Sequence, residues 1–361
     1  MLSNNELLSK TITFLRFPLI IAVVFIHTGL FNVNIGGKIL ISKGQFPLHD
    51  MLNQLVSQEL ARIAVPLFFF MSGFLFFRQS EFSLSAYQAK LKKRIRTLLI
   101  PYVFWNMAVL FLYFLTQTFL SSMTSGMNKL ITEYTLSDWF GVFWNHRENM
   151  PVCYQFWFIR DLMVVILCSP LVYGIVRYGK AASIVFLGLL WCFGLWFHVV
   201  GFSIAALFFF SFGAWFAVSK KNFIVKFKPF RLSFTFLYLL IIVADTFCKY
   251  HELHRLSFLH NVGIIIGLIA VISWTAYGIE SQKLKCSTWL AGSAFFIYAY
   301  HGMPIAFLTK YWVKQMQPAS ELTMILGYLV IPLVVVGLGL VFYYFMQKVF
   351  PRFTGFITGG R

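Results

Sequence analysis

Long runs of apolar residues dominate the chain, and short polar or basic segments separate them. The runs are about 20 residues long and do not alternate between apolar and polar positions, which favours membrane-spanning helices over barrel strands. A helix satisfies its own backbone polar groups, so it can cross a bilayer alone. The pattern predicts an all-α membrane protein with about ten spans, at residues 11–31, 60–78, 98–120, 156–176, 181–198, 201–218, 232–249, 260–279, 288–309 and 322–347.

The connections between these spans carry further predictions. A tight hairpin around His198 to Gly201 joins the fifth and sixth spans, and it leaves counts of nine or eleven open. Pro332 predicts a bend in the tenth span. Residues 32–59 end in apolar positions at helical spacing, so a short helix is expected to lie on the outer membrane face. The loop 121–155 either covers a site or serves only as a connector.

Composition excludes the soluble classes of protein. Of the 361 residues, 59% are hydrophobic and 12% are charged, whereas soluble domains carry roughly 45–50% and 25%. This excludes a soluble enzyme, a disordered chain and a disulfide scaffold, because no soluble fold of this length can bury so much apolar surface. The five cysteines are scattered without metal-ligand spacing, and no metal is expected. The first run is expected to be a retained helix, within a single membrane domain over residues 1–361 and without a separate soluble domain.

The charge of the chain predicts its orientation. The formal net charge is +18, from 30 Lys and Arg against 12 Asp and Glu. The bases cluster at the ends of apolar runs, which indicates membrane topology rather than a nucleic-acid partner. With the N-terminus in the cytoplasm, ten spans place 20 of the 30 bases on the cytoplasmic side. The bias therefore predicts that both termini are cytoplasmic.

The first span holds two ionisable residues, Arg16 and His27. Eleven residues correspond to three helical turns plus about 20°, so both side chains project from one face, about 16 Å apart along the axis. Ionisable residues inside a span are functional by default, because placing them in lipid costs several kcal/mol. Histidine suits general-base chemistry, since its ordinary pKa is near 6.5. The alternative is a packed histidine that bonds to a neighbouring helix.

Ser72 and Gly73 interrupt an aromatic run in the second span. Small residues at this position allow two helices to approach closely, so a packing notch is one interpretation. The other interpretation gives the Ser72 hydroxyl a role in a polar site within the membrane.

A dense basic segment follows the second span and includes Lys93, Arg94 and Arg96. One explanation is the positive-inside bias together with attraction to anionic lipid head groups. The other is a docking site for a phosphorylated cytosolic ligand, because arginine forks bind phosphate with two parallel hydrogen bonds. The sequence leaves both explanations open.

Polar residues of several spans are expected at similar depth in the outer half of the bilayer. Trp157 fits an interfacial aromatic belt, and Asp161 lies about one turn further in. Tyr298 and His301 are three residues apart and share a helix face. Together with His27, and with Asp245 of the seventh span, they predict a polar layer on the side opposite the basic segment.

These motifs make the chain similar to acyltransferase family 3, a family of integral-membrane acyltransferases that includes polysaccharide O-acetyltransferases. The features that carry the resemblance follow the family's order along most of the chain: Arg16 with His27, the segment Val65–Phe74, Lys93–Arg96 before Pro101, Phe156–Arg160, and Tyr298 with His301.

The resemblance implies a ten-helix O-acyltransferase in the bacterial inner membrane. Cytosolic acyl-CoA, usually acetyl-CoA, would supply the acyl group to a hydroxyl of an outward-facing glycan or lipid-linked sugar. The family's essential histidine and arginine correspond to His27 and Arg16, and its basic loop corresponds to Arg94 and Arg96. Lys93 stands at the first basic position of that loop, where it keeps the charge but loses the arginine fork.

A mechanism follows as a hypothesis. The CoA phosphates dock at the basic segment, the pantetheine arm rises between helices, and His27 takes the proton of the acceptor or carries the acyl group itself. Tyr298, His301 or Ser72 would bind the oxyanion or the acceptor, as would Trp157 and Asp161. Asp161 or Asp245 would orient a histidine. A transporter or flippase of a lipid-linked sugar is the alternative, although paired broken helices and internal symmetry are not visible in the sequence.

Overall fold

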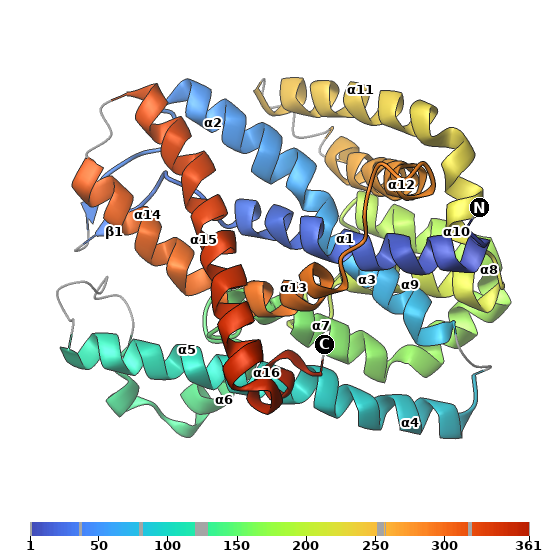
Figure 1. Ribbon diagram of the computed structural model, residues 1–361, viewed down its shortest axis with the longest axis horizontal. Helices are drawn as coiled ribbons and strands as arrows, with labels where there is room; N and C mark the ends of the chain where they lie inside the picture. Colours follow the sequence, from blue (N-terminus) through green and yellow to red (C-terminus); the bar gives the residue numbers. More distant parts are fainter. Residues whose placement is uncertain are drawn as a thin grey trace. The chain divides into compact units, whose positions relative to one another are not determined.

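The computed structural model describes residues 2–35, 38–78, 82–119, 129–250, 256, 258–316 and 320–360 (Figure 1). In these residues the regular secondary structure is helical apart from one short antiparallel pair of strands, β1 (Asn34–Ile35) and β2 (Lys38–Ile39). The α-helices are α1 (Asn4–Ile26), α2 (Pro47–Asn53), α3 (Ala64–Phe77), α4 (Leu84–Arg94), α5 (Ile100–Phe119), α6 (Leu136–Trp144), α7 (Trp157–Leu167), α8 (Ser169–Cys192), α9 (Ile204–Val218), α10 (Phe223–Phe227), α11 (Arg231–Tyr250), α12 (Phe258–Glu280), α13 (Thr288–Tyr300), α14 (Gly302–Met316), α15 (Glu321–Val349) and α16 (Pro351–Thr358).

Seven helical segments are long and apolar enough to cross a membrane, counting only the described residues. They are Asn4–Ile26, Pro47–Phe77, Leu84–Phe119, Ser169–Cys192, Phe223–Lys249, Phe258–Glu280 and Glu321–Val349. The apolar helix α9 has 15 residues and falls short of that length. The prediction of an all-α integral membrane protein is therefore confirmed in its coarse form.

Several helix boundaries differ from the predicted spans. Helix α1 ends at Ile26 rather than at residue 31, and His27 follows directly. The expected short helix over residues 48–59 is present, but it continues through a π-helix and a 3₁₀ turn into α3. The expected basic loop is also helical, because α4 runs through a π-helical turn into α5. Hydropathy marks apolar stretches and does not show whether a helix continues through the polar residues beside them.

Two backbone breaks occur, one between two predicted spans and one inside a predicted span. Lys180 has φ 50° and ψ −134° inside α8, which places a kink between the predicted fourth and fifth spans. His301 separates α13 from α14 inside the predicted ninth span. At Pro332, where a bend was predicted, helix α15 continues without a break in its assignment. Part of the predicted loop 121–155, residues 121–128, lies outside the described residues.

The chain divides into two compact units. The first unit comprises Met1–Ala22, Glu59–Arg94 and Asp161–Gly292, and the second comprises Val23–Gln58, Ile95–Arg160 and Ser293–Arg361.

In the first unit, α3 packs on α9, α9 on α8, and α11 on α12. At the crossing of α3 and α9 the backbones touch. A Cβ atom on Gly73 would lie 1.9 Å from the Phe210 carbonyl oxygen, and one on Gly213 would lie 1.9 Å from that of Phe70. The packing-notch interpretation of Gly73 is therefore confirmed. Aromatic rings such as Phe70 and Phe216 fill the space around this crossing, with centroids 6.0 Å apart.

In the second unit, α15 contacts α2, α14 and α16, and α16 contacts α5. The Trp105 indole of α5 donates to the Ile357 carbonyl of α16 at 3.0 Å. Glu321, at the start of α15, accepts from the backbone N–H groups of Leu48 and His49 at 3.1 and 3.0 Å. This carboxylate holds the first turn of α2, whose N–H groups have no partner within their own helix.

Candidate functional site

His27 lies in the second unit, at the turn that ends α1. Its backbone N–H bonds to the Val24 carbonyl at 3.2 Å, which closes the last turn of the helix. The half-buried imidazole packs edge-on against the Tyr154 ring, with centroids 5.0 Å apart. The His301 ring lies 5.4 Å away. The structure thus brings together two histidines that the sequence places 274 residues apart.

His301 is fully buried between α13 and α14. Its Nδ1 lies 3.2 Å from the Ile297 carbonyl oxygen. A carbonyl only accepts, so Nδ1 carries the proton in this contact and Nε2 is left as an acceptor. Among the described residues, Nε2 of His301 has no hydrogen-bond partner. This buried nitrogen is therefore able to accept a hydrogen bond.

Tyr298 shares this region but its hydroxyl is already engaged. It donates to the Gln155 carbonyl at 2.6 Å, and its ring stacks on Phe156 with centroids 5.4 Å apart. The Gln155 amide in turn donates to the Ala299 carbonyl at 2.9 Å. The predicted shared face of Tyr298 and His301 is confirmed, with ring centroids 6.1 Å apart. Tyr298 therefore joins the segment before α7 to α13.

Gly302 makes room for the two side chains that come from this segment. A Cβ atom at residue 302 would lie 2.8 Å from Oε1 of Gln155 and 3.1 Å from Cε1 of Tyr154. Tyr154 and Gln155 also line a largely apolar cavity of about 540 Å³, together with residues of α5, α13 and α14. Tyr154 thus both lines this cavity and contacts the His27 ring. Sequence reasoning missed Tyr154 because a single aromatic residue before a helix carries no periodic signal.

His49 is a further buried histidine of the second unit that sequence reasoning missed. Its Nδ1 lies 3.0 Å from Oδ1 of Asp50, and its Nε2 has no partner among the described residues. Its ring packs against Tyr328, whose hydroxyl bonds to Ser57 at 2.7 Å. In the sequence, two adjacent polar residues such as His49 and Asp50 are typical of an exposed helix. Only the fold shows that His49 is buried.

The remaining predicted residues divide between the two units. Trp157 and Arg96 belong to the second unit, where Trp157 begins α7 and is half-buried. Five others belong to the first unit: Arg16 of α1, Ser72 of α3, Lys93 and Arg94 of α4, and Asp161 of α7. Asp161 is buried, Arg16, Ser72 and Arg94 are half-buried, and Lys93 is exposed.

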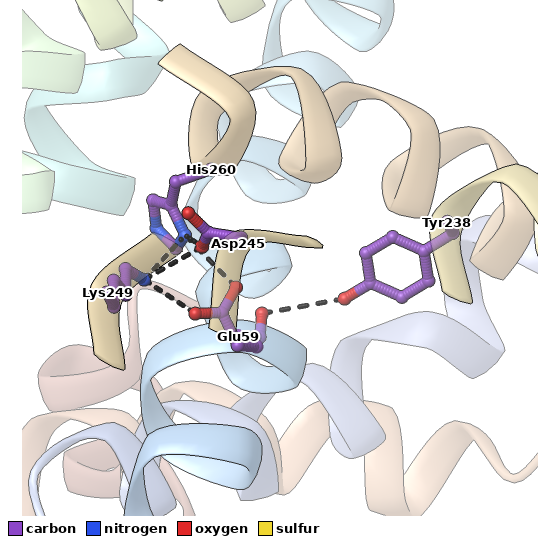
Figure 2. A network of polar contacts seen from close by, with 5 residues as sticks. All are labelled: Glu59, Tyr238, Asp245, Lys249 and His260. Carbon is purple, nitrogen blue, oxygen red and sulfur yellow. Dashed lines mark hydrogen bonds and ion pairs between the residues drawn. The ribbon is translucent and has the colours of Figure 1, made fainter. Parts of the chain in front are cut away.

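Asp245 takes part in a buried ionic network of the first unit, drawn in Figure 2. Its Oδ2 lies 2.9 Å from Nζ of Lys249, one turn further along α11. Glu59 contacts the same ammonium at 2.5 Å, and Nδ1 of His260 lies 3.1 Å from each carboxylate. The expected carboxylate–histidine contact of Asp245 therefore exists, but its partner is His260.

The spacing of this network also suits a cation. One ligand atom from each of Glu59, Asp245 and His260 lies within 4.8 Å of the others. Figure 2 shows that Lys249 reaches both carboxylates, so its ammonium supplies positive charge at this position. The Tyr238 hydroxyl donates to the Glu59 carbonyl at 3.5 Å, which links the network to the middle of α11.

The segment before α7 is held by Arg160. Its guanidinium donates to the Trp144 and Asn149 carbonyls at 2.6 and 2.7 Å and lies over the Trp144 ring. Nearby, burial and the neighbouring Arg147 lower the pKa of His146 below its ordinary value. Hydrogen bonds from Lys129 and Thr135 lower the pKa of Asp138, whose carboxylate completes the capping box of Thr135 at the start of α6. The segment is thus an ordered connection, held by side-chain contacts.

Comparison with known proteins identifies the family of the chain. A family model described as an acyltransferase domain matches residues 10–344. The succinoglycan biosynthesis protein ExoH of Rhizobium meliloti (strain 1021) is 28% identical over 180 residues, which is 50% of this chain and 46% of ExoH. The chain thus aligns with about half the length of this curated relative. No solved structure matches. Because the family model covers most of the sequence, the chain belongs to the acyltransferase 3 family.

Proposed function

We propose that the enzyme transfers an acetyl group from cytosolic acetyl-CoA to a hydroxyl of an outward-facing glycan or lipid-linked sugar. The family supports acyl transfer, and the name of ExoH, a succinoglycan biosynthesis protein, supports a polysaccharide acceptor. The single observation that carries the site assignment is the cluster of His27, Tyr154 and His301 in the second unit. It combines a general base with a buried acceptor atom that lacks a described partner.

His27 is the proposed general base. Its neutral imidazole takes the proton of the acceptor hydroxyl while the oxygen attacks the thioester carbonyl. The new C–O bond forms, the C–S bond breaks, and the CoA thiolate receives the proton from the imidazolium. In the second version, His27 attacks the thioester carbonyl, the C–S bond breaks, and the released CoA thiolate takes the imidazole proton. The acceptor hydroxyl then attacks the acyl-imidazole, the C–N bond breaks, and the imidazole nitrogen takes the hydroxyl proton. Both versions leave acetylated glycan and free CoA.

His301 is the proposed partner of the acceptor. With its Nδ1 proton donated to Ile297, its Nε2 can accept a hydrogen bond from a sugar hydroxyl next to His27. Ser72, Trp157 and Asp161 are proposed to contribute further contacts to the acceptor. Tyr298 is proposed to act as a positioning residue, because its hydroxyl already bonds to Gln155.

The donor is proposed to bind through its phosphates to the basic residues Lys93, Arg94 and Arg96, with help from Arg16. Arginine forks match phosphate oxygens, and a lysine contributes a point charge. Arg96 and Lys93 are exposed, which suits a soluble ligand.

The whole chain is proposed to act as one acyltransferase domain that crosses the bacterial inner membrane ten times, with both termini in the cytoplasm. Two features support ten crossings. The kink at Lys180 separates α7 and the first part of α8 from the second part of α8, so that this region provides two crossings instead of one. Helix α9 provides a further crossing, and α13 with α14 provides another, in addition to the seven long helices.

Turnover by the purified protein tests this function. Protein in lipid nanodiscs is incubated with acetyl-CoA and a bacterial glycan, and free CoA is measured together with the acetyl content of the glycan by mass spectrometry. We expect one acetyl group on the glycan for each CoA released. Transport of a lipid-linked sugar without release of CoA would instead establish the flippase alternative and overturn the proposal.

A further inference from the structure

The turn that carries His27 is braced by side chains of the next helical segment. Asn53 donates from Nδ2 to the Thr28 carbonyl at 3.2 Å, and the Ser57 hydroxyl donates to the Phe25 carbonyl at 2.6 Å. These two carbonyls lie on either side of His27 in the sequence. Asn53, Ser57 and His27 belong to the same unit of the chain. The contacts therefore hold the backbone from which the His27 imidazole projects.

The Ser57 contact is part of a directed chain of hydrogen bonds. A carbonyl oxygen only accepts, so the single Ser57 hydroxyl proton is committed to Phe25. The Tyr328 hydroxyl, 2.7 Å from the Ser57 oxygen, is then the donor in that contact. Ser57 and Tyr328 are both fully buried, so bulk water does not compete for either bond. Helix α15 thus supports the His27 turn through Ser57.

Helix α15 also fixes the bracing segment at a second point. Glu321 accepts from the backbone N–H groups of Leu48 and His49 at the start of α2. Glu321 and Tyr328 are seven residues apart, which is about two helical turns, so they lie on one face of α15. The segment that braces the His27 turn is therefore anchored to α15 at both of its ends.

The bracing segment contains a π-helix at Gln54–Leu60, directly after Asn53, and Ser57 lies in its middle. A π-helix is rare in proteins and occurs mostly as a local insertion in an α-helix, frequently at a functional site. A rare backbone conformation persists where the surrounding structure supports it. Here Ser57 supplies such support through its contacts with Phe25 and Tyr328.

Helix capping alone does not explain the Ser57 contact. The last four carbonyls of an α-helix have no partner within the helix, and a side chain can supply one. The Phe25 carbonyl, however, already accepts from the Thr28 backbone N–H at 3.1 Å. Ser57 therefore adds a second hydrogen bond to a group that already has one.

We propose that Asn53 and Ser57 are positioning residues for acyl transfer, which hold the His27 imidazole against Tyr154 and His301. The proposal rests on the proposed role of His27 as the general base. Both residues act on the backbone of the His27 turn and not on a substrate. Proton transfer needs the base within hydrogen-bond reach of its partner, roughly 2.6–3.2 Å, so a small displacement of this turn lowers the rate.

Acetyl transfer and backbone hydrogen exchange, measured on the full-length protein in nanodiscs, test the proposal. The test variants are Ser57→Ala and Asn53→Leu, which remove the two donors and keep similar side-chain volumes. The matched control is Ser273→Ala, because Ser273 is a fully buried serine of the other unit that donates to the Ile269 carbonyl at 2.6 Å. His27→Ala is measured in parallel, alone and combined with Ser57→Ala.

We expect Ser57→Ala and Asn53→Leu to lower kcat about tenfold or more, while KM for acetyl-CoA changes less than about twofold. Ser273→Ala should keep the wild-type kcat, although it also loses a buried hydrogen bond. Ser57→Ala should add no further loss of rate to His27→Ala, because it acts through that residue. Exchange of the His27 and Thr28 backbone N–H groups should rise about fivefold or more in Ser57→Ala and stay unchanged in Ser273→Ala.

These measurements separate the proposal from the proposed function. Wild-type rates of transfer by His27→Ala would end the proposed function and the positioning role together. If His27→Ala is inactive while Ser57→Ala and Asn53→Leu keep the wild-type kcat, the positioning role alone is overturned. Unchanged hydrogen exchange of the His27 turn in Ser57→Ala overturns the positioning role whatever the activity.

Discussion

Asp245 is a buried carboxylate in an apolar helix, where an unpaired charge costs several kcal/mol. Lys249 and His260 offset that cost through the contacts in Figure 2. Changing Asp245→Asn leaves the ammonium and the imidazole with one carboxylate instead of two. Because Lys249 is partly exposed, we expect a moderate loss of about 1–3 kcal/mol in the free energy of unfolding. Unfolding of the purified protein in detergent measures this loss.

Two further variants show whether the loss in the free energy of unfolding comes from the ionic contact itself. Asp245→Asn/Lys249→Met should lose less stability than the sum of the two single changes, because the partners act together. Glu280→Gln breaks the exposed contact with Lys228, which is 2.6 Å long, and should cost only about 0–1 kcal/mol. Equal losses from Asp245→Asn and Glu280→Gln would contradict the stabilising role of the buried network.

Tyr298 offers a different residue-scale prediction, because its hydroxyl bonds to a buried backbone carbonyl. Tyr298→Phe leaves the Gln155 carbonyl without this donor and should lower stability by about 1–3 kcal/mol. Its effect on turnover should be small compared with that of a general-base variant, since we propose that Tyr298 acts by holding its neighbours. Thermal unfolding and CoA release, measured on the same preparation, compare the two effects. A large loss of turnover at unchanged stability would make Tyr298 a catalytic residue.

At this scale the sequence predicted some partners and missed others. The depth of His27 and His301 in their spans predicted a common layer, and the rings are in contact. The contact of Asp245 with His260 was missed, because pairing between helices depends on how each helix is rotated about its axis. Spacing along one chain contains no information on that rotation.

The backbones of helices α3 and α9 approach each other closely at Gly73 and Gly213. A methyl group on Gly73 would overlap the Phe210 carbonyl, and neither backbone can move without separating the helices. Gly73→Ala should therefore cost more than the 1–3 kcal/mol that is typical of overpacking, about 3 kcal/mol or more. The yield of folded protein and its melting temperature in detergent measure the effect.

Gly174→Ala in α8 is the matched control, because a Cβ atom there meets nothing within 4 Å. It should leave stability unchanged or raise it by about 0.5–1 kcal/mol, since alanine is the better helix former. If Gly73→Ala and Gly174→Ala behaved alike, the close crossing of α3 and α9 would be wrong.

The elements themselves were largely predictable, whereas their ends were not. Each predicted apolar span contains a helix in the described residues, because burial in lipid requires helical backbone pairing. The segments around residues 48–59 and 90–96 were expected outside the spans, yet they continue the neighbouring helices. Polar residues end an apolar span in the sequence, but they do not require the helix to end there.

At the scale of the whole molecule, the distribution of charge predicts the topology. Twenty of the 30 basic residues fall on one side when ten crossings and a cytoplasmic N-terminus are assumed. A reporter that is active only in the cytoplasm should therefore be active after residue 361 and inactive after residue 146. Fusions after residues 180 and 200 test the connections between the fourth and fifth spans and between the fifth and sixth spans. The reporter should be active after residue 180 and inactive after residue 200. Activity after residue 146 and silence after residue 361 would reverse the orientation.

The central claim is that His27 performs the chemistry of acyl transfer, and acetyl incorporation by His27→Ala tests it most directly. Wild type, His27→Ala and the exposed-histidine control His198→Ala are compared in nanodiscs with labelled acetyl-CoA and glycan. We expect His27→Ala to keep the melting temperature of the wild type and to lose about 10²–10⁴-fold in rate, while His198→Ala transfers acetyl groups normally. Wild-type rates of transfer by folded His27→Ala would contradict the account.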